Sequence, residues 1–132
     1  MKAALLAAMA VVFASPALAK GACAPGLHSA VVAELFFGRN SDAGEVSEDD
    51  WRGFLDAEVT PRFPDGLTVW DGRGQWRGPD GVLERESSKV LLLALSGPVA
   101  DQAKLEAIRS AYKAKFHQQS VLLVERVECV GV

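Results

Sequence analysis

The chain has 132 residues, a length that suits a single domain with one hydrophobic core. Its 14 lysines and arginines are outnumbered by 17 aspartates and glutamates, and the net charge of −3 leaves no basic excess, so we expect no binding to nucleic acid. With two histidines, two cysteines and no CxxC pair, the sequence predicts neither a bound metal nor another cofactor.

The first 19 residues have the pattern of a secretory signal peptide. Lys2 provides the charged start, an Ala-rich apolar run follows, and Ala17-Leu18-Ala19 matches a small-x-small cleavage site. The apolar run is too short to favour a transmembrane helix. We therefore expect cleavage before Lys20, an exported protein (periplasmic or secreted) and no stable membrane span afterwards. A retained N-terminal membrane anchor is the alternative.

Residues 20–30 are predicted to be an irregular lead-in that contains Cys23, whereas Cys129 lies close to the C-terminus. Because an exported protein meets an oxidising compartment, we expect a disulfide between Cys23 and Cys129. It would close a loop of about 100 residues and stabilise the fold by roughly 4 kcal/mol. A metal-binding or redox pair is the alternative. A lipid anchor on Cys23 is not expected, because Lys20 stands where a lipoprotein signal carries an apolar residue.

A single domain is predicted over residues 31–132, and it begins with a strand. Val31–Phe37 is rich in β-branched and aromatic residues, which favour a strand. After a polar loop, Ser47 has the character of an N-cap for a first helix that ends before Pro61. The apolar residues that recur there at helical spacing are Trp51, Phe54, Leu55 and Val59.

The middle of the chain is predicted to be extended. Gly66–Trp70 has the composition of a strand, and Asp71–Gly74 that of a tight turn into a further extended piece, Gln75–Arg77. Lys89–Leu95 (KVLLLAL) is the most apolar run after the signal peptide. Its short length indicates a central buried strand in preference to a helix.

Pro98–Phe116 is predicted to be a second helix with Asp101 on its polar face, and Val121–Val127 the last strand. The resulting order, βαββαβ, predicts a ferredoxin-like α+β fold in which two helices cover one face of a mainly antiparallel sheet. The other face would be open and apolar, and such a face is usually covered by a partner or forms a ligand cleft. We therefore expect a homodimer through this face or a small-molecule site on it.

Several runs of sequence carry a family resemblance. They are FFGR (Phe36–Arg39), WRGFLDAEV (Trp51–Val59), TPRFPDGLTV (Thr60–Val69), GQWR (Gly74–Arg77) and SKVLLL (Ser88–Leu93). Together they resemble a bacterial exported family known only as domain of unknown function 3574. The resemblance extends over nearly the whole domain. It implies the same architecture and an exported location, and it implies no reaction.

The stretch Val59–Trp76 gathers the residue types of a binding loop. Its candidate ligand-binding residues are Arg62, Asp65, Trp70, Asp71 and Trp76, and Arg39 is a further candidate from outside the stretch. A guanidinium beside an aromatic ring can hold a carboxylate or phosphate group. The alternative, which we favour, is structural: Asp65 caps a turn fixed by prolines, and Arg62 pairs with a nearby acid.

Glu34 is a carboxylate in an otherwise apolar strand. If it faced inward, burial would raise its pKa and make it a candidate general acid or base. We favour the alternatives, in which it pairs with Lys89 or with an arginine of an adjacent strand, or points to water. No nucleophile motif is present, and no catalytic residue is assigned.

We therefore predict a small exported binding or accessory domain of unknown ligand, acting through the open sheet face and the Arg62–Trp76 loop. The absence of a recognisable nucleophile, metal cluster or cofactor loop favours this reading over an enzyme. One alternative is a small periplasmic enzyme in which Glu34 or Asp71 acts as a base and Arg62 or Arg39 holds an anion. Another is a structural envelope protein that acts only by dimerisation.

Overall fold

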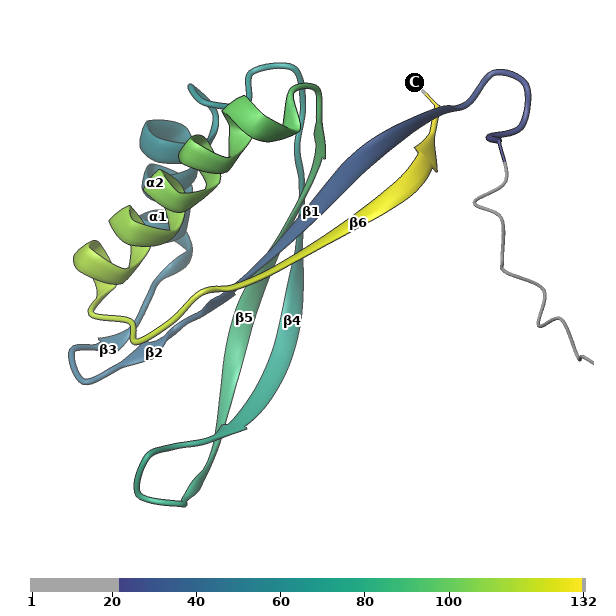
Figure 1. Cartoon of the computed structure of the whole chain (residues 1–132). Helices are drawn as coiled ribbons and strands as arrows, with labels where there is room; N and C mark the ends of the chain where they lie inside the picture. Colours follow the sequence, from purple (N-terminus) through teal and green to yellow (C-terminus); the bar gives the residue numbers. More distant parts are fainter. Residues whose placement is uncertain (1–21, 132) are drawn as a thin grey trace, which may run out of the picture.

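The computed structural model describes residues 22–131, so the predicted signal peptide, residues 1–19, lies outside the described residues. It shows a four-stranded antiparallel sheet with helices packed on it (Figure 1). The elements are β1 (His28–Gly38), β2 (Asn40–Ser41), β3 (Gly44–Glu45), α1 (Glu48–Phe54), the π-helix η1 (Leu55–Val59), β4 (Thr68–Arg77), β5 (Leu83–Leu95), α2 (Pro98–Phe116) and β6 (Leu122–Val130). The strand order is β4-β5-β1-β6, and β2 and β3 form a separate short hairpin.

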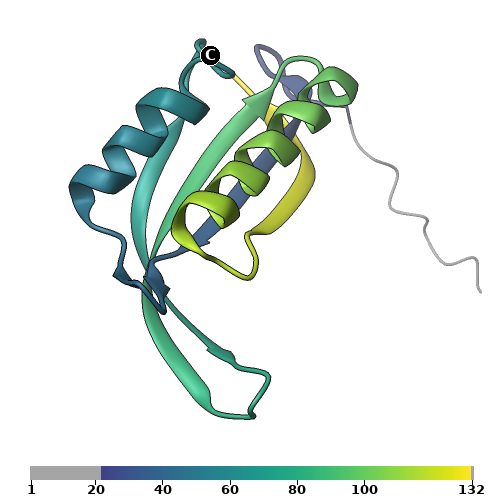
Figure 2. The same ribbon diagram turned by 90° about the vertical axis from the view of Figure 1, so that its left-hand side faces the viewer.

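Both α1 and α2 lie on the same face of the sheet (Figure 2), so the predicted ferredoxin-like α+β fold is confirmed. The run Lys89–Leu95 lies in β5, which pairs antiparallel with both β4 and β1, as expected of a central strand. In both views no described helix covers the other face, which we call the open face.

The hydrophobic core lies between the helices and the sheet. Alternate residues of the two central strands point into it and are buried: Ala33, Leu35, Phe37, Leu91, Leu93 and Leu95. The Phe37 ring lies 4.7 Å from the Tyr112 ring and 5.1 Å from the Trp51 ring, measured between centroids. Such tilted and edge-on aromatic contacts add to the stabilisation from buried area. Phe37 therefore joins the end of β1 to both helices.

Near the N-terminus of both α1 and α2, a side chain accepts a hydrogen bond from a backbone N–H group that has no partner within the helix. At α1 the predicted N-cap is present, and Ser47 Oγ accepts a hydrogen bond from the Asp50 N–H at 3.1 Å. At α2, Asp101 was predicted to be exposed on the polar face of the helix. This prediction is wrong, because the side chain is buried. Its carboxylate accepts hydrogen bonds from the Gly97 N–H at 3.1 Å and from Lys104 Nζ at 2.8 Å. The carboxylate turns back over the first turn because the N–H groups there have no partner within the helix.

The segment Asp71–Gly74 is not the predicted turn. It is part of the continuous strand β4, and the chain reverses later, between Arg77 and Leu83. Gly72 lies opposite Ser88 of β5, and a Cβ on Gly72 would lie 2.7 Å from Ser88 Oγ. This glycine therefore permits a close approach between two strands, which is the other common reason for a glycine in a strand.

β4 and β5 continue beyond the rest of the sheet as a two-stranded ribbon (Figure 1). β1 ends with Gly38 opposite Ser88, whereas the pairing of β4 with β5 runs on to Arg77 opposite Leu83. We call residues 73–87 the arm. Its exposed apolar side chains are Trp76, Val82 and Leu83. A protruding ribbon with exposed apolar groups is a candidate to form part of a binding surface.

β1 begins earlier than predicted, because His28–Ala30 pair with Glu128–Val130 of β6. These three residues were assigned to the irregular lead-in, since their composition does not favour a strand, and only the presence of β6 beside them makes them extended. The same pairing brings Cys23 close to Cys129. The two form the predicted disulfide, with their Cα atoms 5.5 Å apart.

Between residues 22 and 131, no helix combines the length and the apolar character needed to cross a membrane. Over this same described range, no three His, Cys, Asp or Glu side chains are grouped so that they could hold a metal ion.

Replacement of both Cys23 and Cys129 by serine should lower the free energy of unfolding by about 4 to 5 kcal/mol, because the disulfide restrains an unfolded loop with a sequence separation of 106. Urea unfolding monitored by circular dichroism measures the difference. Wild-type protein in excess reductant should match the double variant. Equal stability of the variant and the oxidised wild type would contradict the prediction.

Candidate functional site

The open face is largely apolar. Because side chains alternate along each strand, residues of neighbouring strands meet there in register. Phe36 of β1 lies opposite Val90 of β5 and Leu122 of β6, and Trp70 of β4 pairs with Val90 on the far side. Trp70 is 42% exposed and Leu122 is 59% exposed. The sheet thus presents apolar side chains that no described part of the chain covers.

Glu34 lies on the open face and is paired with an arginine of the adjacent strand β6. Its two carboxylate oxygens accept hydrogen bonds from Arg126 Nη1 and Nη2 at 2.9 and 3.0 Å. The hydrogen bond from Arg126 lowers the pKa of Glu34, and the same contact raises the pKa of Arg126. A carboxyl group held ionised in this way is a poor proton donor at neutral pH.

A cavity of about 520 Å³ lies at the end of the open face where the arm leaves the sheet. We call it the hollow. Phe36, Trp76 and Leu122 contribute apolar side chains to its wall. The β2–β3 hairpin and residues 117–120, the loop after α2, contribute polar groups. Segments far apart in the sequence therefore meet around one cavity.

Hydrogen bonds through Asn40 hold the walls of the hollow together. Gln118 Nε2 donates to the Asn40 carbonyl oxygen at 2.7 Å, which links the loop after α2 to the start of β2. The Asn40 N–H donates to Glu86 Oε2 at 3.2 Å, and Asn40 Nδ2 donates to the Arg85 carbonyl at 3.3 Å. His117 ends α2 in the left-handed conformation, with φ of 53°, and so turns the chain into this loop.

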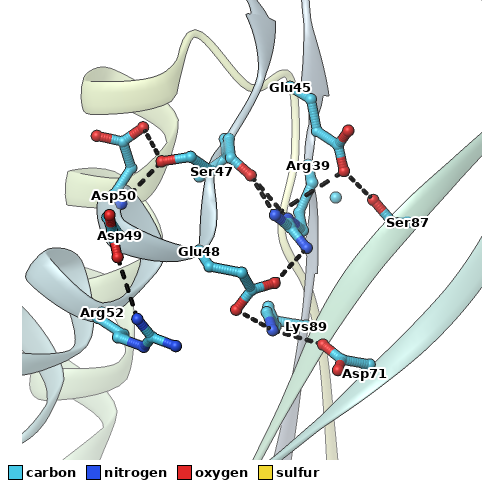
Figure 3. A network of polar contacts seen from close by, with 12 residues as sticks. Arg39, Glu45, Ser47, Glu48, Asp49, Asp50, Arg52, Asp71, Ser87 and Lys89 are labelled. Atoms are coloured by element: carbon cyan, nitrogen blue, oxygen red, sulfur yellow. Dashed lines mark hydrogen bonds and ion pairs between the residues drawn. The ribbon is translucent and has the colours of Figure 1, made fainter.

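An ion-pair cluster lies on the helix-covered face, at the base of the arm (Figure 3). The side chain of Lys89 is 7% exposed, and its ammonium lies 2.8 Å from Glu48 Oε2 and 2.5 Å from Asp71 Oδ1. Glu48 Oε1 accepts a second hydrogen bond from Arg39 Nη1 at 2.7 Å. Arg39 Nε also donates to the Val46 carbonyl at 2.8 Å. We call Arg39, Glu48, Asp71 and Lys89 the cluster; it joins α1, β4, β5 and the chain that leaves β1.

The cluster keeps its carboxylates ionised. The hydrogen bond from Lys89 is the main reason that the pKa values of Glu48 and Asp71 are lowered. Burial acts to lower the pKa of Lys89, but the hydrogen bonds and the charge attraction of Asp71 and Glu48 together outweigh burial, and the pKa is raised. Asp71 is therefore charged and already engaged at neutral pH, which suits a structural role better than that of a general base.

A smaller cavity of about 240 Å³ lies beside the cluster. Arg39, Arg73 and Ser87 are among its lining residues. The Arg39 guanidinium is occupied by Val46 and Glu48, and Ser87 Oγ donates to Glu45 Oε1 at 2.7 Å. Much of the polar lining is thus bonded within the protein, and the volume falls below the roughly 300 Å³ at which small-molecule sites begin.

The structure separates the predicted site residues. Arg39 and Asp71 belong to the cluster, Trp76 lines the hollow, and Glu34 and Trp70 lie on the open face.

Arg62 and Asp65 line neither cavity. Arg62 Nη1 donates to the carbonyl and to Oε2 of Glu58 at 2.6 and 2.9 Å, as the structural alternative predicted. Asp65 is exposed in the turn before β4. The Arg62–Trp76 loop therefore does not form one site, and only its last three residues, Gly74, Gln75 and Trp76, line the hollow.

Sequence reasoning missed Glu48, the site role of Lys89 and most of the hollow. For Lys89 a signal was available, since a lysine that opens the most apolar run of the chain needs an acidic partner when it is buried. For the hollow there was none. Asn40–Asp42 and residues 117–120 lie 75 or more positions apart and are brought to the arm only by the tertiary fold.

Replacement of Lys89 by methionine should lower stability most between about pH 5 and pH 10. The lowered pKa values of Glu48 and Asp71 give stability that is present above their unfolded pKa values and lost as the pH falls through the folded ones. The raised pKa of Lys89 gives stability that is lost as the pH rises through its folded value. Urea unfolding of both proteins from pH 3 to pH 11 checks this; a pH-independent difference would contradict it.

Three solved structures have a similar fold. A phage SAM lyase in complex with S-methyl-5'-thioadenosine aligns with a TM-score of 0.61 at 17% identity, over 86% of this chain and 96% of the lyase. The same type of enzyme in the apo state gives 0.58 at 18% identity, over 79% and 90%. CutA from Synechococcus elongatus PCC7942 gives 0.50 at 9% identity, over 76% and 78%. At such identities the likeness shows the fold alone.

A search of curated protein sequences found no match. A family model described as "Protein of unknown function (DUF3574)", in contrast, matches residues 32–131. The matched span contains all the strands and helices described above except the first residues of β1, and it contains every run of sequence on which the family resemblance was based. The chain therefore belongs to the DUF3574 family.

Proposed function

We propose that the protein is an exported domain that binds a small molecule in the hollow. The observation that carries the proposal is the cavity itself. Its volume of about 520 Å³ lies within the range typical of small-molecule sites, and apolar side chains line it together with a few polar groups. Trp76 and Phe36 offer aromatic ring surfaces. The polar wall is held in place by the hydrogen bond from Gln118 to the Asn40 carbonyl.

The local chemistry favours binding over catalysis. The two acids considered as bases, Glu34 and Asp71, are each hydrogen-bonded to a cation that lowers the pKa, so neither is poised to exchange protons near pH 7. The two arginines considered as anion holders are also engaged, Arg39 with Glu48 and Arg62 with Glu58. The periplasmic enzyme alternative therefore has little support from these groups.

Export is supported by two independent features. The first 19 residues have the pattern of a secretory signal, and the Cys23–Cys129 disulfide is of a kind that persists in oxidising compartments. With Cys23 bonded to Cys129, its thiol would not be available for a lipid anchor.

The phage SAM lyase supplies a starting probe. It carries the same fold and was solved in complex with S-methyl-5'-thioadenosine, a compound of a size that suits the hollow. We therefore place this nucleoside in the first set of compounds to test.

A homodimer through the open face is a second candidate, with a structural role in the cell envelope. The observation that favours it is the charge balance of this face. Glu34 forms an ion pair with Arg126 among apolar side chains such as Leu92 and Val124, and Arg126 also pairs with Glu128. Two copies could therefore pack about a twofold axis with the charge of Glu34 already paired within each copy. The hollow lies at one end of the face and would not be filled by contacts at its centre.

Trp76→Ala should weaken small-molecule binding about tenfold, because the hollow loses an aromatic wall. Thermal-shift screening of small envelope metabolites and S-methyl-5'-thioadenosine identifies a ligand, and calorimetry measures its affinity. Trp70→Ala is the matched control, since Trp70 is a similarly exposed tryptophan of the same strand that does not line the hollow. Equal losses in the two variants, or no ligand in the screen, would refute the proposal.

Leu92→Asp should convert a dimer into a monomer, because it places an unpaired charge near the centre of the open face. Sedimentation equilibrium of the wild type and the variant at micromolar concentration measures the mass. A wild-type protein that sediments as a monomer would exclude the dimer, and a circular dichroism spectrum of the variant would check that it is folded.

A further inference from the structure

We infer that the ligand of the hollow is a small organic cation with a flat ring, such as an aromatic amine or a nucleoside that carries a sulfonium group. The inference rests on the proposed function, because it names the ligand class for the same site. It depends on three features of the hollow: its volume, its unneutralised acidic groups and the position of an aromatic ring beside them.

The lining of the hollow has more acidic than basic groups. Asp42, Glu84 and Glu86 line it, and none of the three forms an ion pair with a described residue. His117 is the one lining residue that can carry a positive charge. The Glu86 carboxylate accepts one hydrogen bond, from the neutral Asn40 N–H. A carboxylate has room for several more donors, so this wall has unused capacity for a cation.

The nearby arginines do not neutralise these acids. Along the arm strands, Arg73, Arg77 and Arg85 alternate with Gly74, Trp76, Glu84 and Glu86, which line the hollow. Successive side chains of a strand start on opposite faces, so these three arginine side chains leave the backbone on the other side of the ribbon, and none of the three lines the hollow. Arg77, for example, donates to the Gly81 carbonyl at the tip of the arm. The separation leaves one side of the arm acidic and the other basic.

An aromatic ring and the acids are brought together by the pairing of the two arm strands. Trp76 lies directly opposite Glu84, and Gly74 lies opposite Glu86. A Cβ on Gly74 would meet no atom within 4 Å, so the space over this glycine is open. A Cβ on Gly38 would lie 2.6 Å from the Glu86 carboxylate oxygens, which therefore sit directly over the bare backbone of β1.

This arrangement selects for charge as well as for shape. A ring stacked on Trp76 would hold a substituent near Glu84 or Glu86. A positive substituent gains from both the carboxylates and the face of the indole, whereas a negative one is repelled by both. The acids Glu34, Glu48 and Asp101 described above already have cationic partners, so a bound cation would gain more from the acids of the hollow than from these three.

The test compares pairs of compounds that share a ring and differ in charge. One pair is S-methyl-5'-thioadenosine and its S-methylated sulfonium derivative, which differ by one methyl group and one positive charge. The other is tyramine and the uncharged N-acetyltyramine. Calorimetry on the whole protein at pH 8 measures the affinity of each compound. We expect at least one cation to bind about tenfold more tightly than its neutral counterpart.

Variants then locate the source of the preference. Glu86→Gln and Glu84→Gln each keep the shape of the side chain, and Glu86→Gln can still accept the hydrogen bond from the Asn40 N–H. Each variant should reduce cation affinity several-fold while the neutral compounds are unaffected. Asp56→Asn is the control, because it removes one exposed acid outside the hollow. Raising the salt concentration should also weaken only the cations.

The outcomes separate this inference from the proposed function. Equal binding of charged and neutral partners, or a preference that survives in both glutamine variants, overturns the ligand class. If a neutral compound still binds and is lost in Trp76→Ala, the hollow remains a binding site and only the charge argument fails. If none of the four compounds binds, the ligand class is overturned as well, and the metabolite screen alone then decides the proposed function.

Discussion

A single buried ammonium group determines how the arm leaves the sheet. Lys89 occupies the last position but one at which β5 still pairs with β1, and beyond it the ribbon has no strand beside it. Its hydrogen bonds with Asp71 and Glu48 tie the base of the arm to β4 and to the helix layer. Arg39 supplies the second positive charge that two carboxylates require. Removing one member would leave the others imperfectly paired, so the four groups act as one unit.

The two faces of the sheet accommodate charge in different ways. Under the helices, the cluster matches its charges at short distance around a nearly buried lysine. On the open face, Glu34 and Arg126 form a matched pair among apolar groups. At the end of that face the matching stops, and the hollow keeps acids with no cation opposite them. The acids of the hollow thus differ from Glu34, Glu48 and Asp71, each of which has a cationic partner.

Local pattern was enough to predict the architecture and not enough to predict the site. Residues 89–95 form a short, apolar run that is rich in leucine, and this pattern favours a buried strand over a helix. Gly72 led to the wrong prediction of a turn, because a turn and a close approach of two strands both favour glycine. The burial of Asp101 depends on its hydrogen bond with the backbone at the helix terminus, which composition does not reveal. Arg62 pairs with Glu58, as the structural alternative for this residue expects. The hollow forms where the tertiary fold brings the β2–β3 hairpin and the loop after α2 next to the arm. A single sequence does not indicate that these distant segments lie together.

The disulfide has a consequence for how the molecule can be held. Cys23 and Cys129 are joined next to the start of β1, where Ser29 pairs with Cys129, whereas the hollow lies past the other end of that strand. The eleven residues of β1 separate the two ends by about 30 Å. The described chain therefore begins and ends at one pole of the domain (Figure 1). A tether attached next to Cys23 or Cys129, to a bead or to a neighbouring module, would leave the cavity at the opposite pole.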